Sequence, residues 1–276
     1  FHLRKSVLEE NTLIEKGKYF SATDLQKTYN SFSRLGAVHY TNINFHEVPH
    51  YDSLVIGKSF AYTTSATRYL NADVQISNNK PNTISFQPEG TNTAGDLGAA
   101  AILSYQNRNL FRGSEILSLD FRAAFEAIRG LEGYKNSNYE EYDVQARLQF
   151  PRFLAPFVTR NFRRRSSATS EVSVGWNLQN RPEFHRRVFS SAWRYHWINS
   201  YDFDLLDVSY VYMPWISETF KQDYLDNATT RNAILRYNYQ DLFILRTGFG
   251  LHYSSASHVY RLNVEFAGNL LNGLGS

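Results

Sequence analysis

Cysteine is absent from the 276 residues, and no stretch of the sequence approaches the length and apolarity of a transmembrane helix. The first absence excludes disulfide bonds, thiolate metal sites and cysteine nucleophiles. The second argues against a helical membrane protein, because a spanning helix needs roughly 20 consecutive apolar residues. If this chain crosses a membrane, it must therefore do so with β-strands.

An excess of charge of one sign is also lacking, since 29 basic residues stand against 26 acidic ones. This near balance offers no electrostatic footprint for DNA or RNA, so no nucleic-acid partner is expected. Aromatic residues, in contrast, are abundant at 16%, although the mean hydropathy is −0.44. Either a soluble β-rich protein or a membrane barrel with aromatic girdles and a polar lumen has such a composition.

The first 80 residues combine helical and strand patterns. A helix is predicted from Ser21 to Arg34, because Ser21 can cap the first turn and Asp24 follows three residues later, as in a capping box. Strands are predicted over residues 38–45 and 70–77, where β-branched and aromatic residues mix with polar ones. These elements together predict a small α/β domain over residues 1–80.

From about Thr83 onward, apolar and polar residues alternate, as Leu119 and Phe121 do with Asp120 and Arg122. The same alternation recurs over residues 142–150, 172–179, 189–197, 245–253 and 260–266. The runs reach about 9–12 residues, the length that a tilted membrane-spanning strand needs, whereas ordinary strands average about 5–6. We predict roughly eight to ten antiparallel strands over residues 81–276, in a transmembrane β-barrel. A soluble β-sandwich is the alternative.

Three groups of segments also carry a resemblance to a known family: residues 17–25 with 35–38 and 42–45, then 90–98 with 104–115 and 150–153, and finally 265–271. In this order they resemble the last POTRA repeat, the first barrel hairpins and a mid-barrel segment of the BamA/TamA superfamily of outer-membrane assembly proteins. The third group is similar to the TamA-like branch from Bacteroidetes. Together the segments cover nearly the whole chain.

The resemblance implies a mainly β protein of the bacterial outer membrane. A small α/β POTRA-like domain would face the periplasm and precede an antiparallel transmembrane β-barrel, of which this chain holds the first half. The lumen-directed Arg-Gly-Phe or Arg-Gly-Tyr motif of the family's C-terminal half is not found in this sequence. The chain is therefore expected to be the N-terminal part of a longer protein.

The function implied by the resemblance is the assembly or translocation of other outer-membrane proteins. Unfolded outer-membrane clients, outer-membrane lipids and periplasmic or lipoprotein accessory subunits are the expected partners, and no cofactor is expected. A two-partner-type secretion pore is the main alternative. A porin-like or enzymatic barrel is a further one, although it would not need the α/β domain.

Two candidate binding edges follow from the family. Its first barrel strand forms a lateral seam where client strands can pair by β-augmentation, and here that strand is expected at Thr83, Ile84, Ser85, Phe86, Gln87, Pro88 and Glu89. Pro88 fits an edge strand because proline cannot donate to a ladder. A second edge is expected at Val38, Tyr40, Asn42 and Asn44. A linker strand and an internal strand are the respective alternatives.

The other conspicuous motifs favour structural interpretations. Residues His46 to His50 match the zinc motif H-E-x-x-H, but the motif needs a helix and Pro49 is incompatible with a helix interior. No metal site and no catalytic set are therefore predicted. A turn that contacts lipid headgroups or a partner is predicted at Arg160, Arg163, Arg164 and Arg165. An aromatic girdle is predicted at Trp193, Tyr195 and Trp197.

Overall fold

The computed structural model describes residues 3–48, 51–56, 59–64, 69–93, 96–128, 138–155, 159, 166, 168–197, 201–225, 236, 238–254 and 257–269. In chain order the elements are α1 (Lys5–Asn11), α2 (Ala22–Ser33), β1 (Val38–Val48), β2 (Tyr51–Ile56), β3 (Ser59–Thr64), β4 (Tyr69–Asn78), β5 (Asn82–Thr93), β6 (Asp96–Asn107), β7 (Ile116–Ala127), β8 (Tyr139–Phe150), β9 (Ala168–Asn180), β10 (Phe184–Trp197), β11 (Tyr201–Ile216), α4 (Glu218–Phe220), η1 (Lys221–Leu225), β12 (Leu242–Ser254) and β13 (Val259–Asn269). None of the helices in these ranges is long and apolar enough to cross a membrane.

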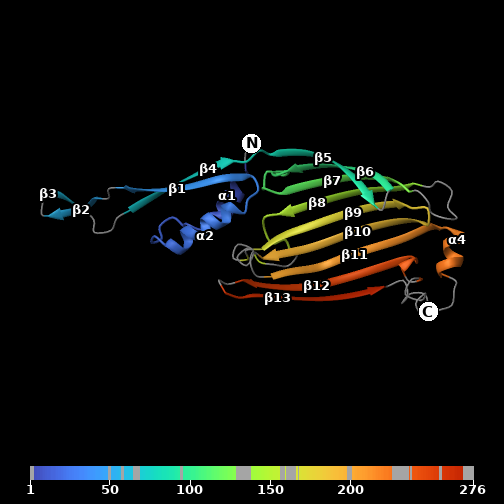
Figure 1. Ribbon diagram of the computed structural model, residues 1–276. Coiled ribbons are helices and arrows are strands. Elements are labelled where there is room, and N and C mark those ends of the chain that lie inside the picture. The colour runs from blue at the N-terminus through green and yellow to red at the C-terminus, as the bar shows by residue number, and fades with distance from the viewer. Residues whose placement is uncertain are drawn as a thin grey trace.

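The N-terminal unit, residues 3–78, packs two helices against a β-hairpin (Figure 1). The predicted helix is confirmed as α2, and Ser21 caps it by accepting a hydrogen bond from the Asp24 backbone N–H at 3.2 Å. Phe32 and Leu35, each 1% exposed, form the core together with Val7 and Val38. This is the ordinary arrangement of a water-soluble domain, with apolar side chains inside.

The two strands that pair in the N-terminal unit, β1 and β4, are each longer than the strands predicted at residues 38–45 and 70–77. β1 pairs antiparallel with β4 from Val38 opposite Asn78 to Val48 opposite Tyr69. Near the helices Ile43 is buried, and its backbone N–H donates to the Tyr29 hydroxyl at 3.1 Å. β2 and β3 pair with each other at the end of the hairpin farthest from the rest of the molecule (Figure 1).

The rest of the described chain is dominated by one antiparallel sheet of nine strands, β5 to β13, each beside its neighbour in sequence. We call it the large sheet. Its strands contain 11 to 16 residues, enough to span a bilayer. The mainly β fold and the predicted antiparallel sheet are confirmed. The sheet is open over the described residues, where β5 and β13 are its two edges, and it does not close into a barrel there.

The register of the large sheet gives it one apolar and one polar face. On one face Phe121 lies opposite Val144, and Val144 lies opposite Trp176 on the next strand. All three side chains are exposed, Trp176 to 57%. On the other face Arg122 lies opposite Asp143. The predicted alternation therefore holds, and among the described residues most large side chains of the apolar face are not covered by protein.

Candidate functional site

The seven seam candidates lie together on β5, the first edge of the large sheet. Over the described residues β5 pairs with β6 alone, from Asn82 opposite Asn107 to Thr93 opposite Asp96. Ile84 and Phe86 are 71% and 65% exposed and belong to the apolar face, whereas Thr83, Ser85, Gln87 and Glu89 alternate with them. Pro88 lies opposite Ala101 within this edge strand, a position where proline is tolerated.

The four candidates on the N-terminal unit lie on β1 but do not share one face. The pairing of β1 with β4 is irregular between Val38 and Tyr40, so the strand shifts its phase there. Val38 is a buried core residue, while Tyr40 is 61% exposed on the side away from the helices. Asn42 and Asn44 follow Tyr40 at alternate positions opposite Gln75 and Asp73. The side chains that a partner could contact on β1 therefore begin at Tyr40. The Val38 side chain is in the core, so only its backbone could take part in binding at this edge.

The zinc-like motif begins in strand β1 instead of a helix. The His46 Nε2 atom lies 3.3 Å from the Asp73 carboxylate across the hairpin. Pro49, His50 and the arginines 160 and 163–165 lie outside the described residues. Within the described part, no group of three or more His, Cys, Asp or Glu side chains is placed to hold a metal ion.

The polar face of the large sheet carries a chain of ion pairs across β8 to β13. Glu171 lies 3.6 Å from Arg147 and 3.9 Å from Arg194. Arg194 contacts Asp204 at 3.1 Å and Asp207 at 3.2 Å. Asp207 continues the chain to Arg246 at 3.1 Å, and Arg246 lies 3.9 Å from Glu265. Acids and bases alternate from strand to strand, so the wall is highly charged without a strong excess of either sign.

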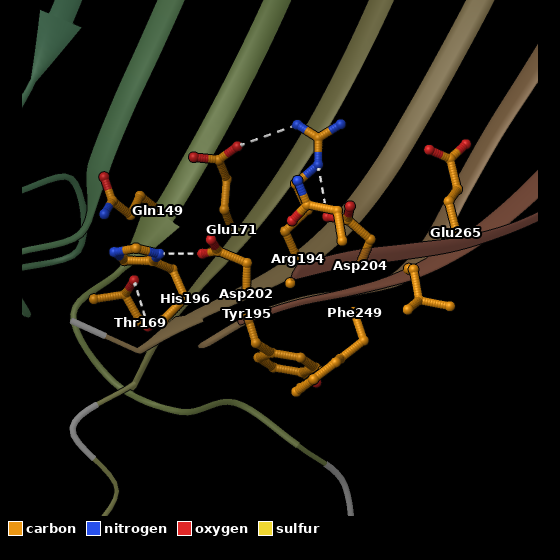
Figure 2. A pocket seen from close by; sticks show the side chains of 14 residues that line it. Gln149, Thr169, Glu171, Arg194, Tyr195, His196, Asp202, Asp204, Phe249 and Glu265 are labelled. Carbon is orange, nitrogen blue, oxygen red and sulfur yellow. Dashed lines mark hydrogen bonds and ion pairs between the residues drawn. The ribbon is translucent and has the colours of Figure 1, made fainter. Parts of the chain in front are cut away.

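A hollow of about 610 Å³ opens on this charged wall. Figure 2 shows Glu171, Arg194 and Asp204 on one side of the sheet and Tyr195 and Phe249 on the other. Two glycines explain the space, because Gly248 and Gly250 lie opposite Asp204 and Asp202 and have no side chains to fill it. Charged side chains around the hollow pair with one another, as Arg194 does with Asp204 and His196 with Asp202. Such a surface suits the inside of a water-filled barrel.

A second polar cluster lies farther along the same face, around Glu141. Its carboxylate accepts hydrogen bonds from Arg122 at 2.6 Å, the Tyr139 hydroxyl at 2.7 Å and Asn177 at 2.9 Å. The Gln179 amide in turn donates to the Tyr139 hydroxyl at 3.0 Å. This network ties β7, β8 and β9 together. The alternation in the sequence predicted the polar positions of Arg122, Asn177 and Gln179, but it did not include Tyr139 or Glu141 and could not pair the side chains.

The three aromatic residues of the predicted girdle share the apolar face of β10. Tyr195 differs from the prediction because only 4% of it is exposed. Phe153, from the segment after β8, lies against its ring at 4.7 Å, and the Tyr195 hydroxyl donates to the Leu154 carbonyl at 2.8 Å. Trp197 donates from its ring nitrogen to Ser166 at 3.1 Å. Protein therefore covers the apolar face at this point.

Comparison with known proteins rests on structure alone, because the sequence matches no protein-family profile and no curated protein sequence. BamA from Haemophilus ducreyi lacking POTRA domains 1-3 aligns with 98% of this chain at 11% identity and a TM-score of 0.50. The fold is similar to that of BamA. The chain spans 46% of the length of that protein. CdiB from Acinetobacter baumannii aligns with 97% of this chain and 61% of its own length, with 11% identity and a TM-score of 0.38.

Proposed function

We propose that the chain forms part of an outer-membrane β-barrel that assembles or exports other proteins, as members of the BamA/TamA superfamily do. The large sheet, corresponding to residues 81–276, would lie in the outer membrane. The N-terminal unit, corresponding to residues 1–80, would be a POTRA-like domain in the periplasm. Within the superfamily we propose the TamA-like branch, on the resemblance of residues 265–271 alone. The observation that carries this proposal is the two-faced large sheet, whose first strand β5 pairs on one side only over the described residues, next to an α/β unit.

The physical case for the membrane comes from the two faces of the large sheet. Water disfavours exposed apolar surface by roughly 25 cal/mol per Å², and soluble proteins rarely leave a patch larger than a few hundred Å² uncovered. Here Ile84, Phe86, Trp176 and Phe266 belong to a face where large apolar side chains are exposed on strand after strand. Hydrocarbon removes that penalty, while the charged face can remain hydrated.

The case for protein assembly comes from β5. An edge strand presents unpaired backbone N–H and C=O groups, which template the pairing of another strand. A client strand could add to β5 by β-augmentation, with its side chains alternating between the exposed Ile84 and Phe86 and the polar Gln87 and Glu89. The exposed part of β1, from Tyr40 to Asn44, would be an earlier contact for the same unfolded clients or for accessory subunits. No nucleotide or cofactor is needed, because hydrogen bonding and burial supply the free energy.

The membrane part of the proposal is tested by single cysteines, introduced into a background without other cysteines; these 276 residues contain none. Phe121 and Val144 would be replaced on the apolar face, and Arg122 and Gln145 on the polar face, in the full-length protein in native outer membranes. We expect a bilayer-confined quencher to reach a fluorophore on the first pair only, and a water-soluble thiol reagent to reach the second pair only. Equal access of the water-soluble reagent to both faces would overturn the membrane assignment.

The assembly part is tested by photo-crosslinking at the seam. A photoreactive residue at Gln87 on β5 is compared with one at Gln145, on the same polar face but within the sheet. During synthesis of a labelled outer-membrane β-barrel client, we expect crosslinks to the client at Gln87 and not at Gln145. Crosslinks to a single exported substrate at Gln145 as well would favour a secretion pore. The absence of client crosslinks at both positions contradicts the proposed seam.

A further inference from the structure

Several segments far apart in the sequence meet where the N-terminal unit joins the large sheet. The Asn79 backbone N–H donates to the Ala37 carbonyl at 2.9 Å, and the Arg108 N–H donates to the Pro81 carbonyl at 2.8 Å. The Arg4 N–H donates to the Arg112 carbonyl at 2.8 Å. The end of α2, the connection from β4 to β5 and the loop between β6 and β7 thus form one contact region. We call this region the joint.

Glu115 lies at the centre of the joint with only 3% of its surface exposed. One carboxylate oxygen accepts a hydrogen bond from the Arg4 guanidinium at 2.9 Å, across 111 positions of sequence. The other oxygen accepts from the backbone N–H groups of Phe111 at 3.2 Å and Gly113 at 2.8 Å. A buried carboxylate is tolerated only when it is paired and hydrogen-bonded, and Glu115 meets both conditions. It binds its own loop with one oxygen and the N-terminal unit with the other.

The loop around Glu115 contains two residues in an unusual backbone conformation. Arg112 and Ser114 have φ angles of 61° and 62°, in the left-handed region that disfavours residues other than glycine. The Ser114 N–H donates to Asn109 at 3.0 Å, and the Ser114 hydroxyl accepts from the Ala37 N–H at 2.9 Å. Backbone strain of this kind persists where surrounding contacts impose it, and such residues are found more often at functional positions.

Space at the joint is also fully used by both partners. A Cβ atom on Gly113 would lie 2.1 Å from a Glu115 carboxylate oxygen and 2.4 Å from the Arg4 guanidinium. A Cβ atom on Gly36, at the end of α2, would lie 2.6 Å from the Ile116 side chain. A larger residue at either position would therefore displace the side chains that meet there. Together with the hydrogen bonds of Glu115 and Ser114, this close packing opposes rotation of the N-terminal unit relative to the large sheet.

We propose that Glu115 is a positioning residue, which with Arg4 fixes the direction of the N-terminal unit relative to the large sheet. This inference rests on the proposed function. Glu115 and Arg4 would hold the β1 edge at a constant angle to the β5 edge, so that a client bound at β1 reaches β5. The alternative, a unit that swings freely on the connection at residues 79–81, would need none of these contacts. Glu115 acts through the placement of two edges and does not itself contact a client.

The test measures the angle directly, in the full-length protein with spin labels on cysteines that replace exposed Lys27 on α2 and Arg261 on β13. We expect one narrow distance distribution in the parent. Arg4→Ala and Glu115→Gln should widen it about twofold, because a freed unit samples several orientations. Arg4→Lys should restore most of the narrowness, since a lysine keeps the charge. Lys5→Ala, which removes only the exposed ion pair with Glu9, is the matched control.

An unchanged distribution in both Arg4→Ala and Glu115→Gln would overturn the proposal, as would equal widening by Lys5→Ala. Glu115→Gln keeps the shape of the side chain, so the test does not depend on whether Arg4→Ala folds. Client crosslinking at Gln87 is then measured in the same variants and should fall when the distribution widens. If the distances respond but even the parent shows no crosslinks, the joint stands and the proposed function fails.

Discussion

The N-terminal unit and the large sheet use the same kinds of apolar side chain in opposite ways. In the unit, Phe32 and Leu35 are almost completely buried, whereas in the sheet Phe86 and Trp176 are more than half exposed. The charged residues of the sheet are kept apart from these apolar side chains. Arg122 and Glu141, for example, form an ion pair on the opposite, polar face. The comparison teaches that burial must be judged against the solvent. Burial away from water accounts for the first region, and the proposed placement of one face in hydrocarbon and the other in water would account for the second.

The largest expected effect is the loss of a buried side chain from the core of the N-terminal unit. Phe32→Ala should destabilise the N-terminal unit by about 3–5 kcal/mol, because it removes a buried ring and leaves a cavity. Hydrogen exchange of the α2 backbone amides measures this locally. Tyr19→Ala, at a fully exposed side chain, is the control and should change stability by less than about 0.5 kcal/mol. Equal losses in the two variants would contradict the assignment of the core.

The next largest effect is expected from a charge placed on the apolar face of the large sheet. Phe121→Arg should destabilise the sheet by about 2–4 kcal/mol in bilayers, since it puts a charge near mid-strand on the face that is proposed to contact lipid. Gln145→Arg, on the polar face, is the matched control and should be close to neutral. Urea midpoints of protein reconstituted in lipid vesicles measure both. A Gln145→Arg loss as large as that of Phe121→Arg would mean that the two faces do not meet different solvents.

Tyr195 sharpens the comparison, because it belongs to the large sheet but is buried as in the N-terminal unit. Tyr195→Phe removes the hydrogen bond to the Leu154 carbonyl and should cost about 1 kcal/mol. Tyr210→Phe, at a 39% exposed position on the same face, should cost less. Proteolysis after residue 150 is expected to accelerate in the first variant alone. No difference between the variants would show that the covering segment is not held by this bond.

The smallest effect concerns an exposed ion pair of the N-terminal unit. The hydrogen bond and ion pair with Glu15, at 2.8 Å, raise the pKa of Lys18 above its ordinary value. Because the folded pKa is the higher one, the stabilisation is complete below the unfolded pKa and is lost as the pH rises through the folded pKa. Glu15→Gln should lower the pKa of Lys18 in an NMR titration, with almost no change in overall stability. An unchanged pKa would mean that the pair does not form in solution.

Much of the fold followed from local patterns in the sequence. Ser21 marked the start of α2 because its cap depends on residues only three positions away. Strict alternation identified β7, β8, β9, β10, β12 and β13, since each strand has one face in each environment. β11 was harder to predict because its register shifts between Asp204 and Asp207. The bulge changes the phase of the alternation, so Phe203 and Leu206 share a face despite their odd spacing.

The remaining features depend on contacts between distant segments, which no local pattern encodes. The seven-residue helix α1 has Arg4 before it and no side-chain cap, so it lacks a start signal. Arg4 and Glu115 are ordinary charged residues until the fold brings them together. The covering of Tyr195 likewise depends on where the chain goes after β8. The seam candidates were placed on one strand by the sequence, but their role is still a prediction that only the crosslinking experiment addresses.

The open edges of the large sheet have a consequence for the order of events during folding. β5 and β13 each leave one side without a neighbouring strand over the described residues. Hydrocarbon contains no hydrogen-bonding groups, and each unsatisfied backbone N–H or C=O there costs several kcal/mol. A sheet placed in a bilayer, as proposed here, therefore needs hydrogen-bonding partners along both edges. Under the proposed function, insertion into the bilayer is coupled to edge pairing, so that the strands which pair with β5 and β13 set its rate.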